Sequence, residues 1–359
     1  MRINRMSLYF IIASIALFIL ILDARTAFAA ASEGISLCIS TVIPSLFPFC
    51  VISIYLTEIL SSSPTRYLRP LEKVLRLPPN TGSIILLGFL GGYPVGAKCI
   101  QQKYASRALS HADAHRMLSF CCNAGPAYIF GIGALLFPDA RLCWLVWLIQ
   151  IVSAFAVACL PPTANGLSNE TDGQHSFSDG SILRQAIAVM ATVCGWILLF
   201  KIILSFVQKW FLWLLPQGIA ILFSGMLELA NGCSLLLQTE STLMRFILFS
   251  VMLSYGGMCV HLQTATVLSG SGLSMRPYLL GKLLQGAFAA FLCVLIMPFW
   301  QEAASPRLYL CLSAPLLIIL PVYLFSMSSK KGIAFSKFTI YNRHNHSGGS
   351  TYETFPQKN

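Results

Sequence analysis

Four glycines and a proline interrupt one apolar run of this chain, Gly88-Phe-Leu-Gly-Gly-Tyr-Pro-Val-Gly-Ala-Lys98. Backbone groups freed by such a break cannot face lipid, so they must be buried in protein or turned toward a water-filled cavity. A half-helix starting near Val95 would point its positive N-terminal end into the break, which suits a carboxylate. The alternative is that these glycines only allow close helix contact and the proline only kinks a helix. The candidate solute-binding residues here are Gly91, Gly92, Tyr93, Pro94, Gly96 and Lys98.

A second break, Asn123-Ala-Gly125-Pro126, interrupts another apolar run. The Asn123 side chain offers hydrogen-bond donors and acceptors, whereas Pro126 lacks a backbone donor. We therefore add Asn123, Gly125 and Pro126 to the candidate site. The alternative is a proline kink, with Asn123 forming a hydrogen bond between helices.

Glu228 is the only carboxylate between Asp179 and Glu240, and apolar residues flank it. An ionisable group inside a membrane segment is costly to bury, so it indicates a functional site. Glu228 could carry a coupling proton or cation, or help Asn231 to bind a polar solute. If the segment instead ends at the membrane interface, Glu228 is simply solvated.

A third break, Gly256-Gly257, is followed by His261 and Gln263, as Gly91-Gly92 is followed by Lys98 and Gln101. Gly256, Gly257 and His261 complete the candidate site. A single histidine in a helix more often hydrogen-bonds to a neighbour than binds a ligand.

No metal, cofactor or catalytic group is expected. His111 and His115 lie four residues apart, but no third ligand is apparent, so a helix start capped by Ser110 is the preferred interpretation. The chain also lacks a phosphate-binding loop, a G-x-S-x-G motif, an H-E-x-x-H motif and any DNA-reading motif. These absences argue against an ATP-driven pump and against an enzyme.

The composition is that of a polytopic membrane protein, because 56% of the 359 residues are hydrophobic and only 10% are charged. We expect an all-α protein with about eight to ten membrane segments, some of them broken or re-entrant. The expected spans are residues 8–22, 35–57, 117–138, 142–160, 186–207, 246–267, 283–300 and 308–327. Two further apolar runs, residues 80–97 and 210–227, are short or interrupted.

The net charge of +11 is explained by topology rather than by nucleic-acid binding, because the basic residues lie in short loops and tails. The positive-inside rule places the N-terminus, the 61–80 loop, the 98–116 segment and the C-terminal tail in the cytoplasm. Residues 80–97 would then enter the membrane and return on the same side.

A polar linker separates two sets of membrane runs and suggests two related halves. In transporters built from such repeats, interrupted helices of the two halves meet at the solute. The predicted organisation is an N-terminal, uncleaved signal-anchor-like helix (1–34), a first membrane half (35–160), a linker (161–181), a second membrane half (182–328) and a basic cytoplasmic tail (329–359).

At residues 88–98 and 118–131 the sequence resembles the YlbJ-like sporulation integral membrane proteins of the nucleoside-recognition (Gate) domain group. The resemblance runs from about residue 43 to residue 315, and an S-G-Y-P-x-G-A type core is its most specific element. Gly91 stands where that core has serine. Gly225, Glu228 and Gly232 fit the G-x-x-E-x-x-x-G pattern expected in the second half.

The resemblance implies a multi-pass protein of a membrane around the forespore that moves dipicolinic acid during endospore formation. A half-helix N-terminus, Lys98, Tyr93 and Asn123 would be plausible partners for the two carboxylates of dipicolinate. The expected partners are therefore membrane lipid and a small organic anion, without nucleic acid, and a homo-oligomer is left open. The alternatives are a non-transporting scaffold in spore maturation and a nucleoside-type transporter.

Overall fold

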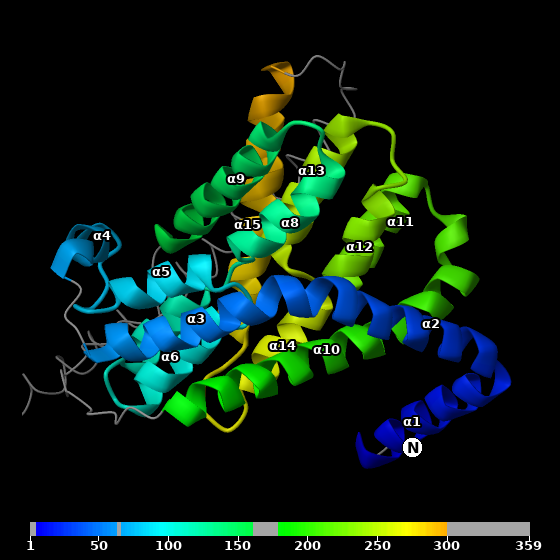
Figure 1. The fold of residues 1–359 in the computed structure, drawn as a ribbon, viewed down its shortest axis with the longest axis horizontal. Helices are drawn as coiled ribbons and strands as arrows, with labels where there is room; N and C mark the ends of the chain where they lie inside the picture. Colours follow the sequence, from blue (N-terminus) through cyan, green and yellow to red (C-terminus); the bar gives the residue numbers. More distant parts are fainter. Residues whose placement is uncertain (1–4, 63–65, 161–178, 300–359) are drawn as a thin grey trace, which may run out of the picture.

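The computed structural model describes residues 5–62, 66–160 and 179–299, and all regular structure within these ranges is helical (Figure 1). The expected all-α class is confirmed. Most of the predicted linker, the last expected span at residues 308–327 and the predicted tail lie outside the described residues.

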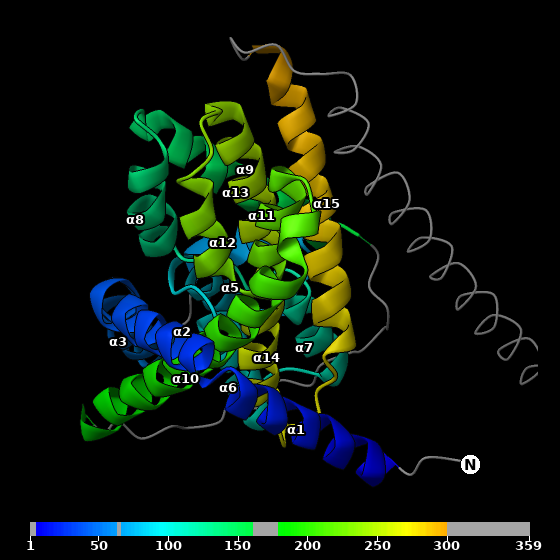
Figure 2. The same ribbon diagram turned by 90° about the vertical axis from the view of Figure 1, so that its right-hand side faces the viewer.

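The N-terminal helices form a bent arm. Helix α1 (Arg5–Leu22) projects from the rest of the molecule (Figures 1 and 2), and the chain turns by 96° before α2 (Ala24–Leu37). Asp23 caps α2 through Thr26 N and also forms an ion pair with Lys209. A π-helical turn, Cys38–Val42, joins α2 to α3 (Ile43–Ser62), so the predicted boundary after residue 34 falls inside α2.

The remaining helices follow in two sets. The first set is α4 (Arg69–Val74), α5 (Gly82–Leu90), α6 (Val95–Ala105), α7 (His111–Leu118), α8 (Pro126–Leu136) and α9 (Ala140–Ala158). The second set is α10 (Asp179–Trp210), α11 (Gln217–Leu227), α12 (Leu229–Leu236), α13 (Thr242–Tyr255), α14 (Gly257–Leu268) and α15 (Arg276–Ile296). Short 3-10 turns lie at Arg66–Leu68, Leu212–Leu214 and Met297–Phe299.

Each set contains a pair of short helices that folds back on itself. In α5–α6, a Cβ atom on Gly96 would lie only 3.2 Å from the Cα atom of Gly88. In α11–α12, Gly232 packs against Gly225 without room for a Cβ atom. Glycine at both contacts lets the two helices of each hairpin approach closely.

The hairpins occupy equivalent places in a repeated order: a long helix, a hairpin, an interrupted helix and a continuous helix. The first order is α3, α5–α6, α7–α8, α9, with the short α4 between α3 and the hairpin, and the second is α10, α11–α12, α13–α14, α15. By this order the counterpart of the Gly91-Gly92 tip is Glu228, the tip of the second hairpin. Gly256, between α13 and α14, instead corresponds to the break at residues 119–125, between α7 and α8. The sequence-based comparison of Gly91-Gly92 with Gly256-Gly257 therefore paired a hairpin tip with the break of an interrupted helix.

Within the described ranges, four helical segments are long and apolar enough to cross a membrane. They are α9, residues 182–210 of α10, α13 together with α14, and α15, and the bent α1–α2 pair would make a fifth. The span expected at residues 117–138 is interrupted where the sequence predicted a break, because the chain leaves the helix between α7 and α8. Pro126, which cannot donate to the preceding turn, begins α8.

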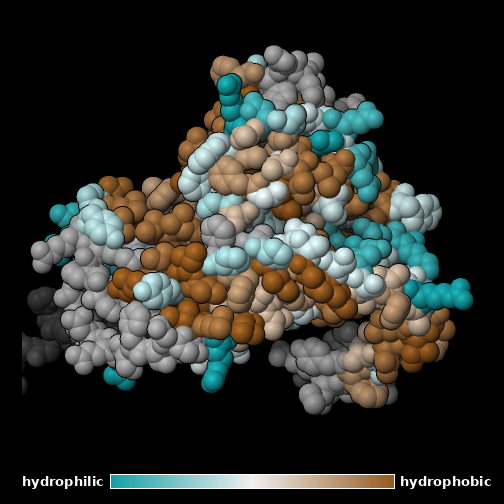
Figure 3. Space-filling view, in the orientation of Figure 1, coloured by the Kyte–Doolittle hydropathy of each residue, from teal (hydrophilic) through white to brown (hydrophobic). Residues whose placement is uncertain are grey.

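Exposed apolar side chains follow the long helices, and the space-filling view shows wide apolar areas on the face that carries α3 and α10 (Figure 3). Along α10 they include Leu183, Ile187, Leu199 and Ile203. Such extensive apolar surface is unusual on a soluble protein and is expected where lipid is the solvent.

Candidate solute-binding site

The tip of the first hairpin packs against the break between α7 and α8. Gly92 has a φ of +76°, which glycine adopts without strain, and a Cβ atom there would lie 3.1 Å from Gly125 N. The helix α6 begins at Val95, as expected from the sequence. Two of the predicted breaks are therefore in direct contact.

Tyr93 connects this hairpin to the other half. Its hydroxyl donates a hydrogen bond of 3.2 Å to the carbonyl of Leu253, in the last turn of α13, and it lies against Gly256. The last turn of a helix has carbonyls without intrahelical partners, and Tyr93 satisfies one of them. Gly256 itself has a φ of +95° and ends α13.

Glu228 is the single residue between α11 and α12, and it is 3% exposed. Its carboxylate accepts hydrogen bonds from Ala230 N at 3.0 Å and Asn231 N at 2.6 Å. Glu228 therefore caps α12, and its negative charge lies at the positive end of that helix. The alternative of a solvated carboxylate at the interface does not fit this burial.

A central cavity lies beside these tips and is lined by predicted and unpredicted residues. Its empty volume, including its open mouth, is about 500 Å³. The polar or aromatic lining comes from Tyr93, Tyr128, Glu228 and Gln263, and the apolar lining includes Val193 and Ile197 of α10. Gly125 also lines it.

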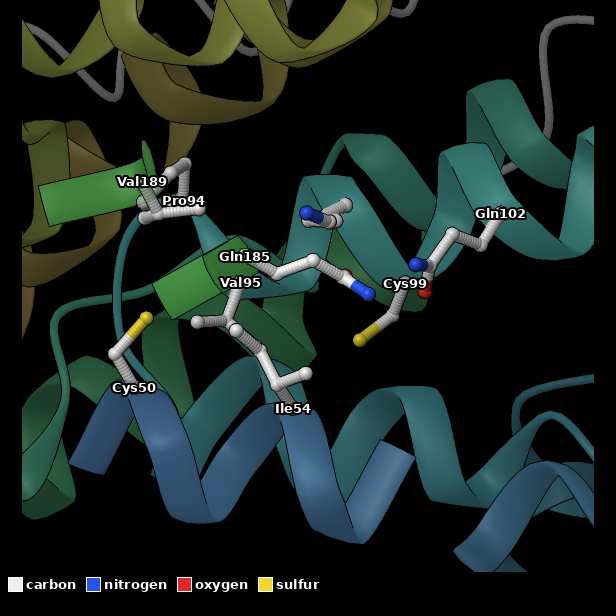
Figure 4. Close-up of a pocket in the computed structure, with 9 residues that line it drawn as sticks. Cys50, Ile54, Pro94, Val95, Cys99, Gln102, Gln185 and Val189 are labelled. Carbon is white, nitrogen blue, oxygen red and sulfur yellow. The ribbon is translucent and has the colours of Figure 1, made fainter. Parts of the chain in front are cut away.

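A second cavity, of about 390 Å³, lies on the α3 side of the first hairpin and is lined by Pro94 and Lys98. Figure 4 shows Cys50 and Ile54 from α3 opposite Val95 and Cys99 of α6. Of the predicted residues of the first hairpin, Tyr93 thus lines one cavity, and Pro94 and Lys98 line the other.

Asn123 lies in a buried polar cluster that sequence reasoning had only partly found. Its side-chain oxygen accepts hydrogen bonds from Lys282 Nζ at 3.3 Å and Gln285 Nε2 at 2.8 Å. Gln150 of α9 donates to the carbonyl of Ala124 at 3.2 Å, in the same break. All four side chains of this cluster are at most 1% exposed: Asn123, Gln150, Lys282 and Gln285.

Lys282 was missed because the expected span started at Leu283, which left the lysine at its edge. The helix α15 in fact begins at Arg276, so Lys282 lies well inside it. The signal in the sequence was a lysine between Leu279-Leu280 and Leu283-Leu284, with a glutamine three residues later on the same helix face.

His261 is hydrogen-bonded within the core, as the alternative interpretation held. Its Nδ1 lies 3.1 Å from the Tyr278 hydroxyl, and its ring meets the Tyr255 ring edge-on. Outside the site, Ser110 caps α7 by accepting from Asp113 N at 3.1 Å, so the expected capped helix start is confirmed.

Nine of the fourteen predicted site residues line neither cavity: Gly91, Gly92, Gly96, Asn123, Pro126, Asn231, Gly256, Gly257 and His261. Gly91 ends α5, Pro126 begins α8, Gly96 packs against the carbonyl of Cys121, and Gly257 packs against that of Gly225. Asn231 contributes its backbone N–H to Glu228. These residues shape the breaks.

The helices, their apolar surface and the buried polar centre define an integral, polytopic, all-α membrane protein. The chain is similar to the sporulation integral membrane protein YlbJ of Bacillus subtilis (strain 168), with 28% identity over 352 residues, covering 83% of this chain and 85% of that protein. The expected YlbJ-like character is thereby confirmed. No protein-family model matches the chain, and no solved structure matches it.

Proposed function

We propose that this protein is a transporter-like membrane protein of endospore formation. It moves a small organic anion, dipicolinate, across a membrane that surrounds the forespore. The proposal assigns it no catalytic activity. The name of the Bacillus subtilis relative, a sporulation integral membrane protein, supports the cellular role.

One observation carries the transport proposal: the two hairpin tips and the break before α8 converge on the central cavity. Tyr93 and Glu228 are tip residues of different hairpins, and both line it with Gly125. Interrupted helices that meet at the interface of two repeats are the usual architecture of a solute site in secondary transporters. A scaffold has no need of such a cavity.

The aromatic part of the cavity lining suits a small aromatic anion. The rings of Tyr93 and Tyr128 offer aromatic contact area for a pyridine ring. The amide cluster around Asn123 lies behind Tyr93, and Lys98 provides a cation in the neighbouring cavity.

Uptake of radiolabelled dipicolinate into proteoliposomes tests the proposal, with Gly92→Leu as the disrupted variant. A side chain at Gly92 would be strained by the positive φ and would meet Gly125, so uptake should fall to the level of empty liposomes. Gly131→Leu is the matched control, because a Cβ atom at Gly131 meets nothing within 4 Å.

The outcomes separate the rival functions. Protein-dependent uptake that Gly131→Leu retains and Gly92→Leu loses supports the proposal. Uptake of uridine or adenosine in place of dipicolinate would indicate a nucleoside-type transporter. If well-folded protein moves none of these solutes, transport of dipicolinate is refuted. The result would then favour a non-transporting scaffold.

A further inference from the structure

Lys282 is the most deeply buried cation of the described chain. It is 0% exposed, and its ammonium donates to Gln285 Oε1 at 2.7 Å and to Asn123 Oδ1 at 3.3 Å. The ring of Tyr93 lies against it, with its centroid 5.1 Å from Nζ. An ammonium has three donors, and two of them are used by neutral amide oxygens.

No carboxylate neutralises this charge among the described residues. By contrast, Lys201 pairs with Glu33 at 3.0 Å, and Lys209 pairs with Asp23. Glu228 is also buried, but its two oxygens accept from the backbone of α12 rather than from a lysine. Burying a charge without a counter-charge is unfavourable, and amide oxygens with an aromatic ring offset only part of that cost.

Tyr93 links the ammonium to the cavity, because it contacts Lys282 and also lines the cavity wall. Lys282 itself does not line the cavity, so an anion there would reach the ammonium only after the Tyr93 side chain moved aside. An anion entering there would supply the missing negative charge.

We propose that Lys282 is the residue that recognises the transported anion, its ammonium pairing with one carboxylate of the solute while Asn123 and Gln285 hold it in place. This inference rests on the proposed function and extends it to a particular residue. The neutral partners explain why the site would select anions: they orient the ammonium without consuming its charge.

Equilibrium binding of dipicolinate to the purified full-length protein in nanodiscs tests this role. Lys282→Met should weaken binding by about 30-fold or more, since losing one partner of a buried charge pair costs about 2 kcal/mol or more. Binding of the neutral isostere, pyridine-2,6-dicarboxamide, should change far less. Lys201→Met is the matched control, because that lysine lies in another membrane helix and already has a carboxylate partner.

Gln285→Glu provides a second variant that does not remove the lysine. A carboxylate at this position would pair with the ammonium 2.7 Å from the present amide oxygen. The variant loses the hydrogen bonds that Gln285 Nε2 donates to Asn123 Oδ1 and to the Gln150 carbonyl, so its folding is checked first. The folded variant should bind dipicolinate at least about tenfold more weakly. A purely structural role for Lys282 predicts no loss of binding in the folded variant.

The results separate the two proposals. If the wild type neither binds nor transports dipicolinate, the proposed function and the role of Lys282 both fail. If the wild type binds it, and folded Lys282→Met and Gln285→Glu bind it equally well, only the role of Lys282 is overturned. If both variants lose binding of dipicolinate but keep binding of the neutral dicarboxamide, the role of Lys282 is supported.

Discussion

At the scale of single residues, Tyr93 is the polar link between the first hairpin and the second half. Its hydroxyl bonds the Leu253 carbonyl, its ring covers Lys282, and its side chain lines the central cavity. The hydroxyl and the ring therefore have separable tasks. The hydroxyl stabilises the contact between halves, whereas the ring borders the ammonium and the cavity.

Tyr93→Phe should separate these tasks. The variant keeps the ring and loses the bond to Leu253, so the free energy of unfolding should fall by about 1 kcal/mol. Unfolding in mixed micelles with increasing sodium dodecyl sulfate measures this change. Tyr67→Phe is the control, since Tyr67 is 69% exposed and should leave stability unchanged. Equal stability of the wild type and Tyr93→Phe would show that the hydroxyl bond does not stabilise the fold.

Single residues also show where sequence reasoning reached its limit. Glu228 was recognised because a lone carboxylate in an apolar run stands out. Lys282 was not, because the start of α15 was placed too late and its lysine looked like a flanking charge. Gln150 and Gln285 gave no warning either, since uncharged amides are common in helices and their contacts with residues 123 and 124 are distant in sequence.

At the scale of elements, the hairpins depend on close contact between glycines of their two helices. The first hairpin was predictable, because four glycines and a proline fall within one short apolar run. The second was not, because only one extended residue, Glu228, separates α11 from α12. Nothing in residues 225–232 indicates from spacing alone that the chain reverses there.

Alanine at the two glycines of the second hairpin should have unequal effects. At Gly232 the new methyl group would meet the backbone of Gly225, which cannot move without opening the hairpin. At Gly225 it would meet the flexible side chain of Met252, which can shift. We therefore expect Gly232→Ala to lose about 1–3 kcal/mol of unfolding free energy and Gly225→Ala distinctly less.

The same micelle titration compares the two variants. Gly195→Ala is a suitable reference, because a Cβ atom there meets nothing within 4 Å and alanine favours the α10 helix. Equal losses of unfolding free energy in Gly225→Ala and Gly232→Ala would contradict this prediction. They would mean that separating the two helices of the hairpin costs no more than moving the Met252 side chain.

At the scale of the whole molecule, two arginines mark opposite ends of α9. Arg116 of α7 donates to the carbonyls of Arg76 and Ala158, beside the base of the first hairpin. Arg245 of α13 donates to the carbonyls of Leu136 and Leu237, beside the base of the second. The helix α9 is a candidate span of 19 residues. The two hairpin bases therefore lie near its opposite ends.

The general architecture could be predicted from the sequence, but this relation between the halves could not. Apolar runs identified the membrane class and glycine-proline breaks identified the first hairpin. The hydrogen bonds from Arg116 to Arg76 and Ala158, and from Arg245 to Leu136, join residues between 40 and 109 positions apart, so no local pattern indicates them.

The opposite positions of the hairpin bases predict opposite accessibility. Ala105, at the end of α6, and Gln238, just after α12, are both exposed. In intact cells, a membrane-impermeant thiol reagent should modify Gln238→Cys from outside, and Ala105→Cys only after permeabilisation, because the 98–116 segment is basic. Replacing the exposed Cys159 with serine removes one background label. Modification of both positions from the same side would rule out hairpins that enter from opposite sides of the membrane.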